Sequence, residues 1–562
     1  MSKKGEKIMS NEKKGKLRKL VIFAIAMGLC LTAIQIGAMS ATYSSEEFVR
    51  KISWNNVPIP EKLAMKENEI SLTSEHRFLP TDIPVASTDD LEIHPTLTMY
   101  GNGLLFGGYT SKLSLFETNI DFIYSGDGGS TWEPANGLNP ELGLLDYLVV
   151  DYLGTGNAVV VTFQPDPSEY DGSEQWRIIM TDPLDSETWD GAAWDWTSHG
   201  YSDLKNPDIA GYNFNGEGPS WYYGWMIGTI SNSGYGYEDG PTFYFANGED
   251  EGSGWVWSWG DSESTSTHSS VDIDRSNGMM YSAWEYYNET TGARDIQLAN
   301  GLLEDYLAAD YVDWGPSPTW QFLGGSESNK YPDVAASNGY VYVVCQADVL
   351  IPGKEDIICF YSHDGGSTWG NSNVAVDSVQ NEMYPSVVSY GEGASVTYII
   401  DGDLYVTHTD DGGVTWDTPE KVNDGTGTVT MEYGTSEIAA SGHTLWTDTR
   451  NGNEDIFYEN VGMPTSPMIT IQSVSGGFGV SSVVANVGTA VATDVQWSID
   501  LEGSVFIGAH KEGTISSLAA GGSETVKTGF VFGLGKATIK VTAGGATQTA
   551  EGTVLGPFVI GL

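Results

Sequence analysis

The chain has 562 residues, and its 75 Asp and Glu against 26 Lys and Arg give a formal net charge of −49. A charge excess of this sign repels phosphate backbones and anionic lipid, which excludes nucleic acid as a partner. Apolar residues at 40% are too many for a disordered chain, and 69 Gly with 29 Tyr and 18 Trp favour an all-β protein.

The first 41 residues differ in composition from the rest. Residues 1–19 hold eight basic side chains, and an apolar run at 20–38 ends in the small-residue sequence AMSA at 38–41. This order is typical of a secretory signal peptide, and the apolar run is also long enough to be an N-terminal membrane anchor. With either alternative we expect an extracellular protein, secreted or held at the cell surface, that meets a membrane only through this segment.

A short motif occurs three times, as YSGDGGSTW at 124–132, YSHDGGSTW at 361–369 and HTDDGGVTW at 408–416. Asp and Ser/Thr side chains can accept backbone N–H groups in a tight turn, Gly takes the positive-φ positions, and Trp buries a large surface beneath. We therefore expect three hairpin loops that share the same conformation. The residues expected to build them are Ser125, Asp127, Gly129, Trp132, Ser362, Asp364, Gly366, Trp369, Thr409, Asp411, Gly413 and Trp416.

These three motifs resemble the Asp-box, or BNR repeat, of sialidases and related β-propellers. In that family the box joins the third and fourth strands of a blade at the rim, far from the central mouth. The resemblance therefore implies a structural role for the boxes and not calcium or ligand binding. No cofactor is expected; calcium in the acidic loops stays open, although no EF-hand-like ligand spacing is present.

A weaker repeat predicts the number of blades. Seven apolar runs, each preceded by a polar or aromatic residue, recur at intervals of 52, 60, 62, 63, 53 and 51 residues, as expected for units of four short strands. We therefore favour seven blades over residues 91–463; six, the usual sialidase number, remain as the alternative. Residues 42–90 could supply an outer strand that closes the ring.

The residues that open these runs are candidates for the channel mouth. They are neutral and mostly aromatic, so they could stack on sugars or peptides, or they could only pack the neck of the ring. Among the carboxylates placed near the mouth are Asp146, Glu382 and Glu437. The expected binding residues are His94, Tyr147, Asn206, His268, Tyr331, Tyr384 and Glu432.

Two cysteines, Cys345 and Cys359, follow the leader, on expected strands at 340–347 and 356–362. These strands would face each other across a hairpin in roughly opposed register, so both a disulfide and two buried thiols are compatible with the sequence. No Cys/His spacing indicates zinc.

The composition changes after the sequence MPTSP at 463–467, because aromatic residues become rare and Gly, Val, Ala, Ser and Thr dominate. Alternating strands over residues 464–562 predict a β-sandwich. With the sequence ANVGTA at 485–490, this region resembles the immunoglobulin-like modules that end many archaeal and bacterial surface proteins.

The resemblance makes sialidase activity the first hypothesis to test. That chemistry requires three arginines for the substrate carboxylate, and Lys does not reproduce the bidentate contact. Beyond the leader there are six arginines, and none opens an inner-strand run, so sialidase activity is not expected. They are Arg50, Arg77, Arg177, Arg275, Arg294 and Arg450.

Two functions remain. The first is an exported propeller with a sandwich stalk that binds a glycan or a cell-envelope protein, or that is structural, without catalysis. The second is an extracellular glycoside hydrolase or lyase, which needs paired carboxylates about 5 to 10 Å apart.

Overall fold

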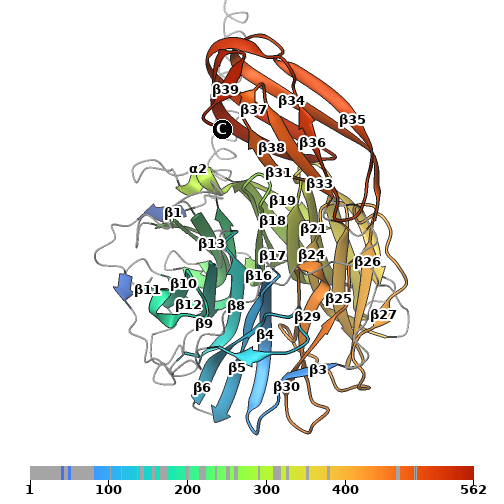
Figure 1. Ribbon diagram of the computed structural model, residues 1–562. Helices are drawn as coiled ribbons and strands as arrows, with labels where there is room; N and C mark the ends of the chain where they lie inside the picture. The colour runs from blue at the N-terminus through green and yellow to red at the C-terminus, as the bar shows by residue number, and fades with distance from the viewer. Residues whose placement is uncertain are drawn as a thin grey trace, which may run out of the picture.

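The structure is a computed structural model that describes residues 39–42, 49–51 and most of 82–562 (Figure 1). Residues 1–38 of the expected leader at 1–41 lie outside the described residues, and residues 39–41 belong to a described strand. In the described part, no helix has the length and apolar character needed to cross a membrane. The gaps after residue 82 are 101–102, 115–116, 136, 139–144, 155–157, 165–173, 196–200, 214–222, 234–236, 248–253, 259–263, 289–291, 308–317, 325–327, 350–352, 376–379, 464–466, 468, 487 and 489.

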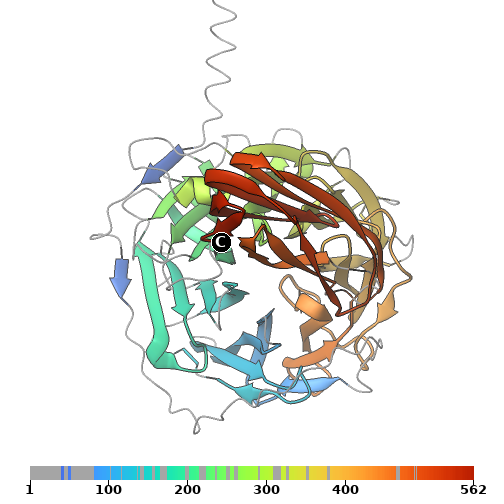
Figure 2. The same cartoon turned by 45° about the horizontal axis from the view of Figure 1, so that its top comes forward.

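Seven antiparallel sheets form a ring, which Figure 2 shows along its axis. The fold is therefore a seven-bladed β-propeller, as the intervals in the sequence predicted. The first three blades are β4 (Leu91–Met99), β5 (Leu105–Ser114), β6 (Glu117–Ser125) and β7 (Glu133–Pro134); β8 (Asp146–Tyr152), β9 (Val159–Gln164), β10 (Glu174–Met180) and β11 (Trp189–Asp195); and β12 (Tyr201–Asn213), β13 (Tyr223–Ser233), β14 (Tyr237–Asn247) and β15 (Gly254–Ser258).

Three further blades have four strands of the chain in sequence order. They are β16 (Ser264–Asp274), β17 (Met279–Asn288), β18 (Arg294–Leu302) and β19 (Thr319–Leu323); β20 (Lys330–Ser337), β21 (Tyr340–Ala347), β22 (Asp356–Ser362) and β23 (Gly370–Ala375); and β24 (Glu382–Ser389), β25 (Ala394–Ile400), β26 (Asp403–Thr409) and β27 (Glu420–Lys421). In the part of the chain that the structure describes, the helical turns are short: η2 (Ser186–Thr188), α2 (Leu303–Leu307) and η5 (Ala440–Gly442).

The seventh blade takes its outer strand from the N-terminal part of the chain. β28 (Ser436–Ala439), β29 (His443–Asp448) and β30 (Asp455–Asn460) are followed in the sheet by β3 (Ile83–Ala86), which pairs antiparallel with β30. Strands β1 (Met39–Thr42) and β2 (Val49–Lys51) add fifth strands to the third and second blades. The two ends of the propeller sequence thus share one sheet, which closes the ring.

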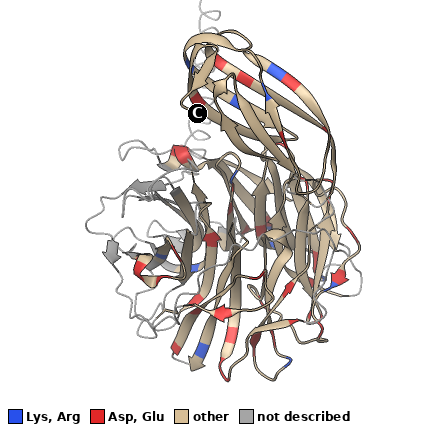
Figure 3. Cartoon of the chain, viewed as in Figure 1, with Lys and Arg blue, Asp and Glu red and all other residues tan. Residues whose placement is uncertain are grey.

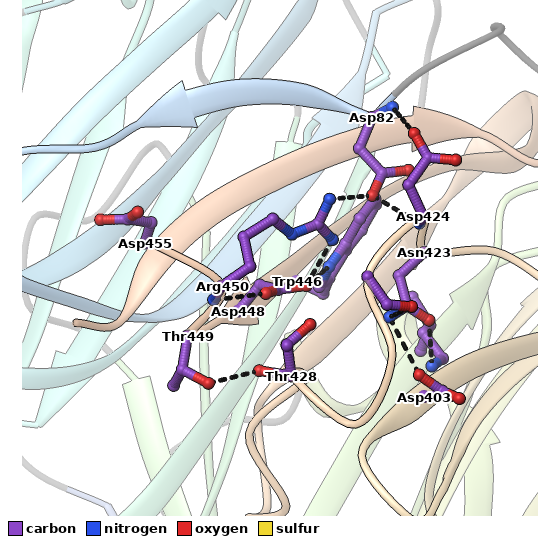
Figure 4. Close-up of polar contacts among 12 residues, drawn as sticks. Asp82, Asp403, Asn423, Asp424, Thr428, Trp446, Asp448, Thr449, Arg450 and Asp455 are labelled. Carbon is purple, nitrogen blue, oxygen red and sulfur yellow. Dashed lines mark hydrogen bonds and ion pairs between the residues drawn. The ribbon is translucent and has the colours of Figure 1, made fainter. Parts of the chain in front are cut away.

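A buried ionic network fixes this closure (Figure 4). The Arg450 guanidinium lies 2.5 Å from the Asp82 carboxylate and 2.5 Å from that of Asp448, and it stacks on Phe457 at 4.1 Å. Asp82 and Asp424 also exchange backbone-to-carboxylate hydrogen bonds of 3.1 and 2.8 Å. The two carboxylates that flank Arg450 are almost inaccessible, with 1% and 0% of their side chains exposed. A single cation therefore holds two buried carboxylates across the joint.

The core of the ring lies between blades, because each sheet buries both faces. In β21 all residues after the first are buried, the pattern of a strand covered on two sides. Its alternate side chains join two different apolar clusters, one toward the preceding blade and one toward the following blade. Large aromatic residues fill these layers, and among the most fully buried are Trp176, Trp225, Trp284 and Trp446.

This layering decides between the two expectations for the cysteines. Cys345 pairs with Ile358 and Cys359 with Val344, so the two cysteines are offset by one position in the ladder. A one-residue offset turns the side chains to opposite faces of a sheet, and each thiol enters a different interblade cluster. Both thiols are buried and free. The disulfide alternative is wrong, because the expected register was wrong by one residue.

The three Asp-Gly-Gly turns have the same hydrogen bonds. In the turn at 362–369, the Asp364 carboxylate accepts the Thr368 N–H at 2.8 Å and its hydroxyl at 2.7 Å, while the Ser362 hydroxyl accepts the Gly366 N–H at 2.9 Å. The turns at 125–132 and 409–416 repeat this pattern. In the turn at 362–369, the Gly365 N–H donates to the carbonyl of Gly339, which lies in the turn between β20 and β21. Because β20 is the inner strand of its blade and ends at this turn, the motif lies on the face of the ring where the inner strands end.

Residues after β30 leave the ring on that same face, since the Val461 N–H donates to Gly442 O in the turn after β28. Two sheets follow, and they stand above the ring in Figure 1. They pack around an aliphatic core that includes Val484, Ile499 and Ile539. The strands are β31 (Ile469–Ser475), β33 (Ser481–Asn486) and β36 (Ser523–Lys527) in one sheet, and β32 (Gly477–Phe478), β39 (Phe558–Ile560), β38 (Ala546–Gly556), β37 (Phe532–Ala543), β34 (Ala492–Ile507) and β35 (His510–Leu518) in the other.

Candidate functional site

Six inner strands share an unusual backbone conformation at one position. A residue other than glycine lies there in the left-handed region, with φ between 47° and 54°, at or beside a break in register with the neighbouring strand. Such a conformation is uncommon outside glycine, and bulges of this kind redirect a side chain. The six residues are His94, Tyr147, Asn206, His268, Tyr331 and Tyr384.

These are the residues that the sequence motifs selected as the channel ring. Each lies in the first half of its inner strand. The Asp-Gly-Gly turns lie at the face where the inner strands end, so the six residues lie toward the opposite face. His94, Tyr147, Asn206 and Tyr384 line a central cavity of about 460 Å³. His268 and Tyr331 join the ring through aromatic contacts described below. The sequence therefore located a repeated backbone feature around one mouth of the channel.

One group at the mouth is centred on His94. Its Nδ1 lies 2.6 Å from Asp146 Oδ1, its Nε2 lies 3.9 Å from Glu432 Oε1, and its ring stacks on Tyr147 with centroids 4.4 Å apart. The two carboxylates thus lie on opposite sides of the imidazole. Burial alone would raise the pKa of Asp146, but the hydrogen bond and charge of His94 outweigh it and hold that pKa below its usual value. Burial raises the pKa of Tyr147 to about 12.

A second group contains four aromatic rings. Tyr433 lies 4.5 Å from His268 and 5.8 Å from Tyr331, whose ring also contacts His268 at 4.5 Å and Tyr384 at 5.1 Å. Tyr433 comes from the segment between β27 and β28, and it is absent from the sequence-based set because it lies just before the seventh inner strand. The one feature of the sequence that marks this residue is the Tyr433-Gly434 pair before β28. This side chain brings the mouth aromatics together.

Ion pairs brace the wall beneath this group. Glu285 Oε2 is 3.7 Å from His268 Nδ1 and accepts the Tyr331 N–H at 3.4 Å, and Arg294 makes a close ion pair with the same carboxylate. Burial alone would raise the pKa of Glu285, but His268 and Arg294 hold it below its usual value. The neighbouring Lys330 pairs with Glu355 at 2.5 Å. Glu285 thus holds His268 and Tyr331 in place at the channel mouth. The sequence analysis did not identify Glu285.

Further down the channel, carboxylates link one blade to the next. Asp208 accepts the Val271 N–H at 2.7 Å, and Asp333 accepts the Val387 N–H at the same distance. Asp151 and Asp272 accept N–H groups of Gly211 and Ala336 in the same way, also at 2.7 Å. These side chains line the cavity, yet protein surrounds them. Their first role is to satisfy backbone donors between inner strands.

Their electrostatics follow from this crowding. Burial, and then the neighbouring Asp333, raises the pKa of Asp208 to about 8. Burial, followed by Asp333 and Asp208, raises the pKa of Glu437 well above its usual value. These channel carboxyls therefore hold their protons to higher pH than ordinary Asp and Glu side chains do. In the described residues, no group of three or more His, Cys, Asp or Glu side chains is arranged to hold a metal ion.

Two sequence candidates lie away from the open mouth. Glu382 has 1% of its surface exposed, and Glu437 lines the channel. Glu432, by contrast, has 47% of its side chain exposed beside His94. Among the carboxylates considered, Glu432 and Asp146 are thus the pair that the structure brings to the mouth.

The arginines do not form a carboxylate-binding triad in the described part of the chain. Arg177 is buried against Trp225, with the guanidinium 4.6 Å from the ring. Arg275 donates to Asp151 at 2.6 Å, Arg294 pairs with Glu285, and Arg450 closes the ring. Three of these four cations are therefore committed to ion pairs within the fold.

No protein-family model matches this chain, and a search of curated proteins returns no match. Solved structures of similar fold include an α-L-arabinofuranosidase from Fusarium graminearum with an iminosugar inhibitor (TM-score 0.37, 9% identity, 67% of this chain and 96% of that chain). The Trypanosoma rangeli sialidase has a TM-score of 0.34 and 12% identity, over 86% of this chain and 92% of that one. The β-propeller domain of the Trilobed protease from Pyrococcus furiosus has a TM-score of 0.35 and 10% identity, over 68% and 94%. These similarities concern the β-propeller fold and supply no argument about what this chain binds.

Proposed function

We propose that this protein is an exported β-propeller of the cell envelope that binds a carbohydrate chain at the channel mouth without cleaving it. The observation that carries the proposal is the ring of left-handed residues that places His and Tyr side chains around one mouth. The three Asp-Gly-Gly turns, which we interpret as Asp-boxes, lie on the opposite face and serve the fold. We interpret residues 464–562 as an immunoglobulin-like stalk.

The chemistry of the mouth suits a sugar. Tyr147, Tyr331 and Tyr384 are half-buried, so each side chain leaves part of its surface open to a ligand. Aromatic faces stack on the C–H faces of sugar rings, and adjacent polar groups orient the hydroxyls. Glu432 and Asp146, on either side of His94, supply acceptors for such hydroxyls.

Hydrolysis is the second candidate, and the Asp146–Glu432 pair favours it. A glycosidase also needs a general acid whose pKa is raised so that it carries a proton. His94 holds the pKa of Asp146 below its usual value. Asp208 and Glu437, whose pKa values are raised, lie inside the channel, where burial and then their charges raise the pKa of Tyr433. Because the acid and the exposed base are not paired at the mouth, binding is the better-supported function.

A glycan array probed with the purified full chain tests this function. We expect binding to a defined set of glycans and about tenfold weaker binding for Tyr147→Ala and for Tyr331→Ala, because each removes one stacking surface. Phe322→Ala is the matched control, since Phe322 is an aromatic residue with 47% exposure on the outer strand β19.

Two results would contradict the proposal. Equal losses for Phe322→Ala and Tyr147→Ala would place binding outside the mouth. Release of sugar from the same glycans by the purified protein, abolished by Glu432→Gln, would establish the hydrolase instead.

A further inference from the structure

An unusual number of large apolar side chains is exposed in the sandwich. Phe506 has 70% of its surface exposed, Leu534 68% and Phe478 63%, although the chain is acidic and charged elsewhere. Soluble proteins rarely expose contiguous apolar patches of this kind without a partner. All of these exposed residues except Val491 form what we call the apolar tip: Phe478, Phe506, Ile507, Phe530, Phe532, Leu534, Leu555, Phe558 and Ile560.

The topology of the sandwich gathers these residues at one end. Gly544, in the turn between β37 and β38, lies against Ile469, the first residue of β31, so that turn is at the end near the ring. Strands β31, β34, β36 and β38 run away from this end, and their far ends with the turns that follow lie within 476–480, 503–509, 528–535 and 553–562. Figure 1 accordingly shows β39 (Phe558–Ile560) toward the end of the sandwich away from the ring.

Direct contacts make the apolar tip continuous. The Phe478 ring lies 5.9 Å from Phe530 and 6.1 Å from Phe558, and Phe530 stacks on Phe532 at 6.4 Å. Across the strands, Ile507 pairs with Phe532, and Leu555 pairs with both Leu534 and Phe558. These contacts connect seven of the nine exposed side chains, and all four segments contribute to them.

The charge of the tip selects its partner. None of the four segments contains Asp, Glu, Lys or Arg, although the chain carries 75 acidic residues. The sandwich as a whole, residues 464–562, has six acidic and four basic residues, so nearly all of the excess lies in the rest of the chain. A second copy would bring another −49 units, and the tip has no cation to offset that repulsion.

We propose that the apolar tip inserts into the surface of a lipid bilayer with zwitterionic headgroups. Such a surface has no net charge to repel the acidic ring, and Phe, Leu and Ile side chains on a compact tip suit the boundary between headgroups and acyl chains. Exposed charges of both signs border the tip segments, Lys511 and Lys536 together with Glu502, Glu512 and Glu551. The two ammonium groups can reach lipid phosphates, and the carboxylates suit a surface without net negative charge. This contact is independent of the apolar run at 20–38 and of the channel mouth.

The test uses a probe that reports on the tip alone, because the run at 20–38 can itself associate with lipid. The full chain with Cys30→Ser and Phe478→Cys is labelled with the fluorophore NBD and mixed with phosphatidylcholine vesicles. Cys345 and Cys359 are buried and stay unlabelled in the folded protein. We expect a several-fold rise in NBD emission and quenching by lipids that carry a nitroxide in the acyl chain.

A matched control places the probe at Val491→Cys, which is 53% exposed just before β34, at the end of the sandwich near the ring; no rise is expected there. Phe506→Ser and Phe530→Ser should each weaken the vesicle response about tenfold, because each removes one aromatic ring that the bilayer would bury. Replacing about a third of the lipid by an anionic phospholipid should weaken binding at low salt, and added salt should restore it.

Several results would overturn this inference. A Phe478 probe that does not respond to vesicles, or a Val491 probe that responds equally, would exclude insertion of the tip. Stronger binding to anionic vesicles would contradict the choice of a neutral surface. A rise in NBD emission with protein concentration alone, lost in the Phe506→Ser variant, would assign the tip to a second copy of the chain.

Discussion

The propeller and the sandwich are both antiparallel β-structures, yet they differ in how many charged residues they contain and in whether their large aromatic side chains are buried or exposed. Residues 1–463 contain 69 acidic and 22 basic side chains and 17 of the 18 Trp residues, and residues 464–562 contain six, four and one. Figure 3 shows acidic positions distributed over the ring. The ring buries its large aromatics between blades, whereas the sandwich has an aliphatic core and exposes five Phe residues at its tip.

The difference shows how each region obtains its stability and its surface. A ring of seven sheets must join each inner strand to the next, and buried carboxylates such as Asp208 and Asp333 accept the N–H groups at these joints. The sandwich satisfies its backbone within two sheets, so its interior needs no ionised group. Its apolar residues in excess of the core are then free to form a contact surface.

The largest expected effect concerns the closure of the ring. Arg450→Ala leaves Asp82 and Asp448 buried without their cation, and we expect a loss of about 3 kcal/mol in the free energy of unfolding of the propeller. Urea unfolding followed by Trp fluorescence measures this, because 17 of the 18 Trp residues lie outside the sandwich. Lys511→Ala, which removes an exposed cation of the sandwich, is the control and should change stability by less than about 0.5 kcal/mol. Equal losses of stability in Arg450→Ala and Lys511→Ala would contradict the expectation that the ring, unlike the sandwich, depends on a buried cation.

A smaller effect should appear as a pH dependence that has opposite signs in the ring and in the sandwich. Burial raises the pKa of Asp208 to about 8, so between about pH 4 and 8 the folded ring keeps a proton that the unfolded chain has lost. Its stabilising contribution is therefore complete at low pH and is lost as the pH rises through this window. In the sandwich, hydrogen bonds from His510 and Ser498 hold the pKa of Asp500 below its usual value, which gives the opposite dependence.

Asp208→Asn keeps an acceptor for the Val271 N–H and removes the titration. We expect the urea midpoint of the ring to decrease less steeply between pH 5 and about 8.5 in this variant than in the native chain. Hydrogen exchange measured by mass spectrometry follows ring and sandwich peptides separately. An unchanged slope in Asp208→Asn would mean that the channel carboxyls do not control the pH response.

The smallest expected effect concerns the repeated turns, which the sandwich lacks. Asp411→Ala removes acceptors for the Thr415 N–H and hydroxyl, and we expect a loss of about 1 kcal/mol in the free energy of unfolding. Asp364→Ala should give a similar loss because its turn has the same hydrogen bonds. Asp410→Ala, at the exposed preceding residue, is the matched control. If Asp410→Ala costs as much as Asp411→Ala, the turn hydrogen bonds are not the source of the effect.

Repetition explains how much of the ring could be predicted from sequence. The residues that open the inner strands recur once per unit, so their spacing carried the number of blades, and the Asp-Gly-Gly turns recur in three of the seven blades. The six channel-ring residues were found because the same left-handed position recurs in six blades. Features that occur once carried no such signal: Tyr433 at the mouth, Glu285 beneath it and Arg450 at the closure were not identified as a set of contacts.

The cysteines show where local pattern reasoning ends. Both strands were located, but a register error of one residue reverses the face of a sheet, and the pairing of Cys345 with Ile358 excludes the disulfide. The apolar tip is a second example, because its nine side chains come from four segments that only the return of each strand brings together.

By itself, the sequence determined the all-β class, the turns and the change of composition near residue 463, and it favoured seven repeated units over six, since turn chemistry, strand alternation and periodicity are local properties. The tertiary structure decided that the blades number seven, which carboxylates are buried with a raised pKa, which cation closes the ring, which aromatics meet at the mouth and which remain exposed at the tip. These depend on side chains far apart in sequence, where burial and neighbouring charge, and not residue type, set the chemistry.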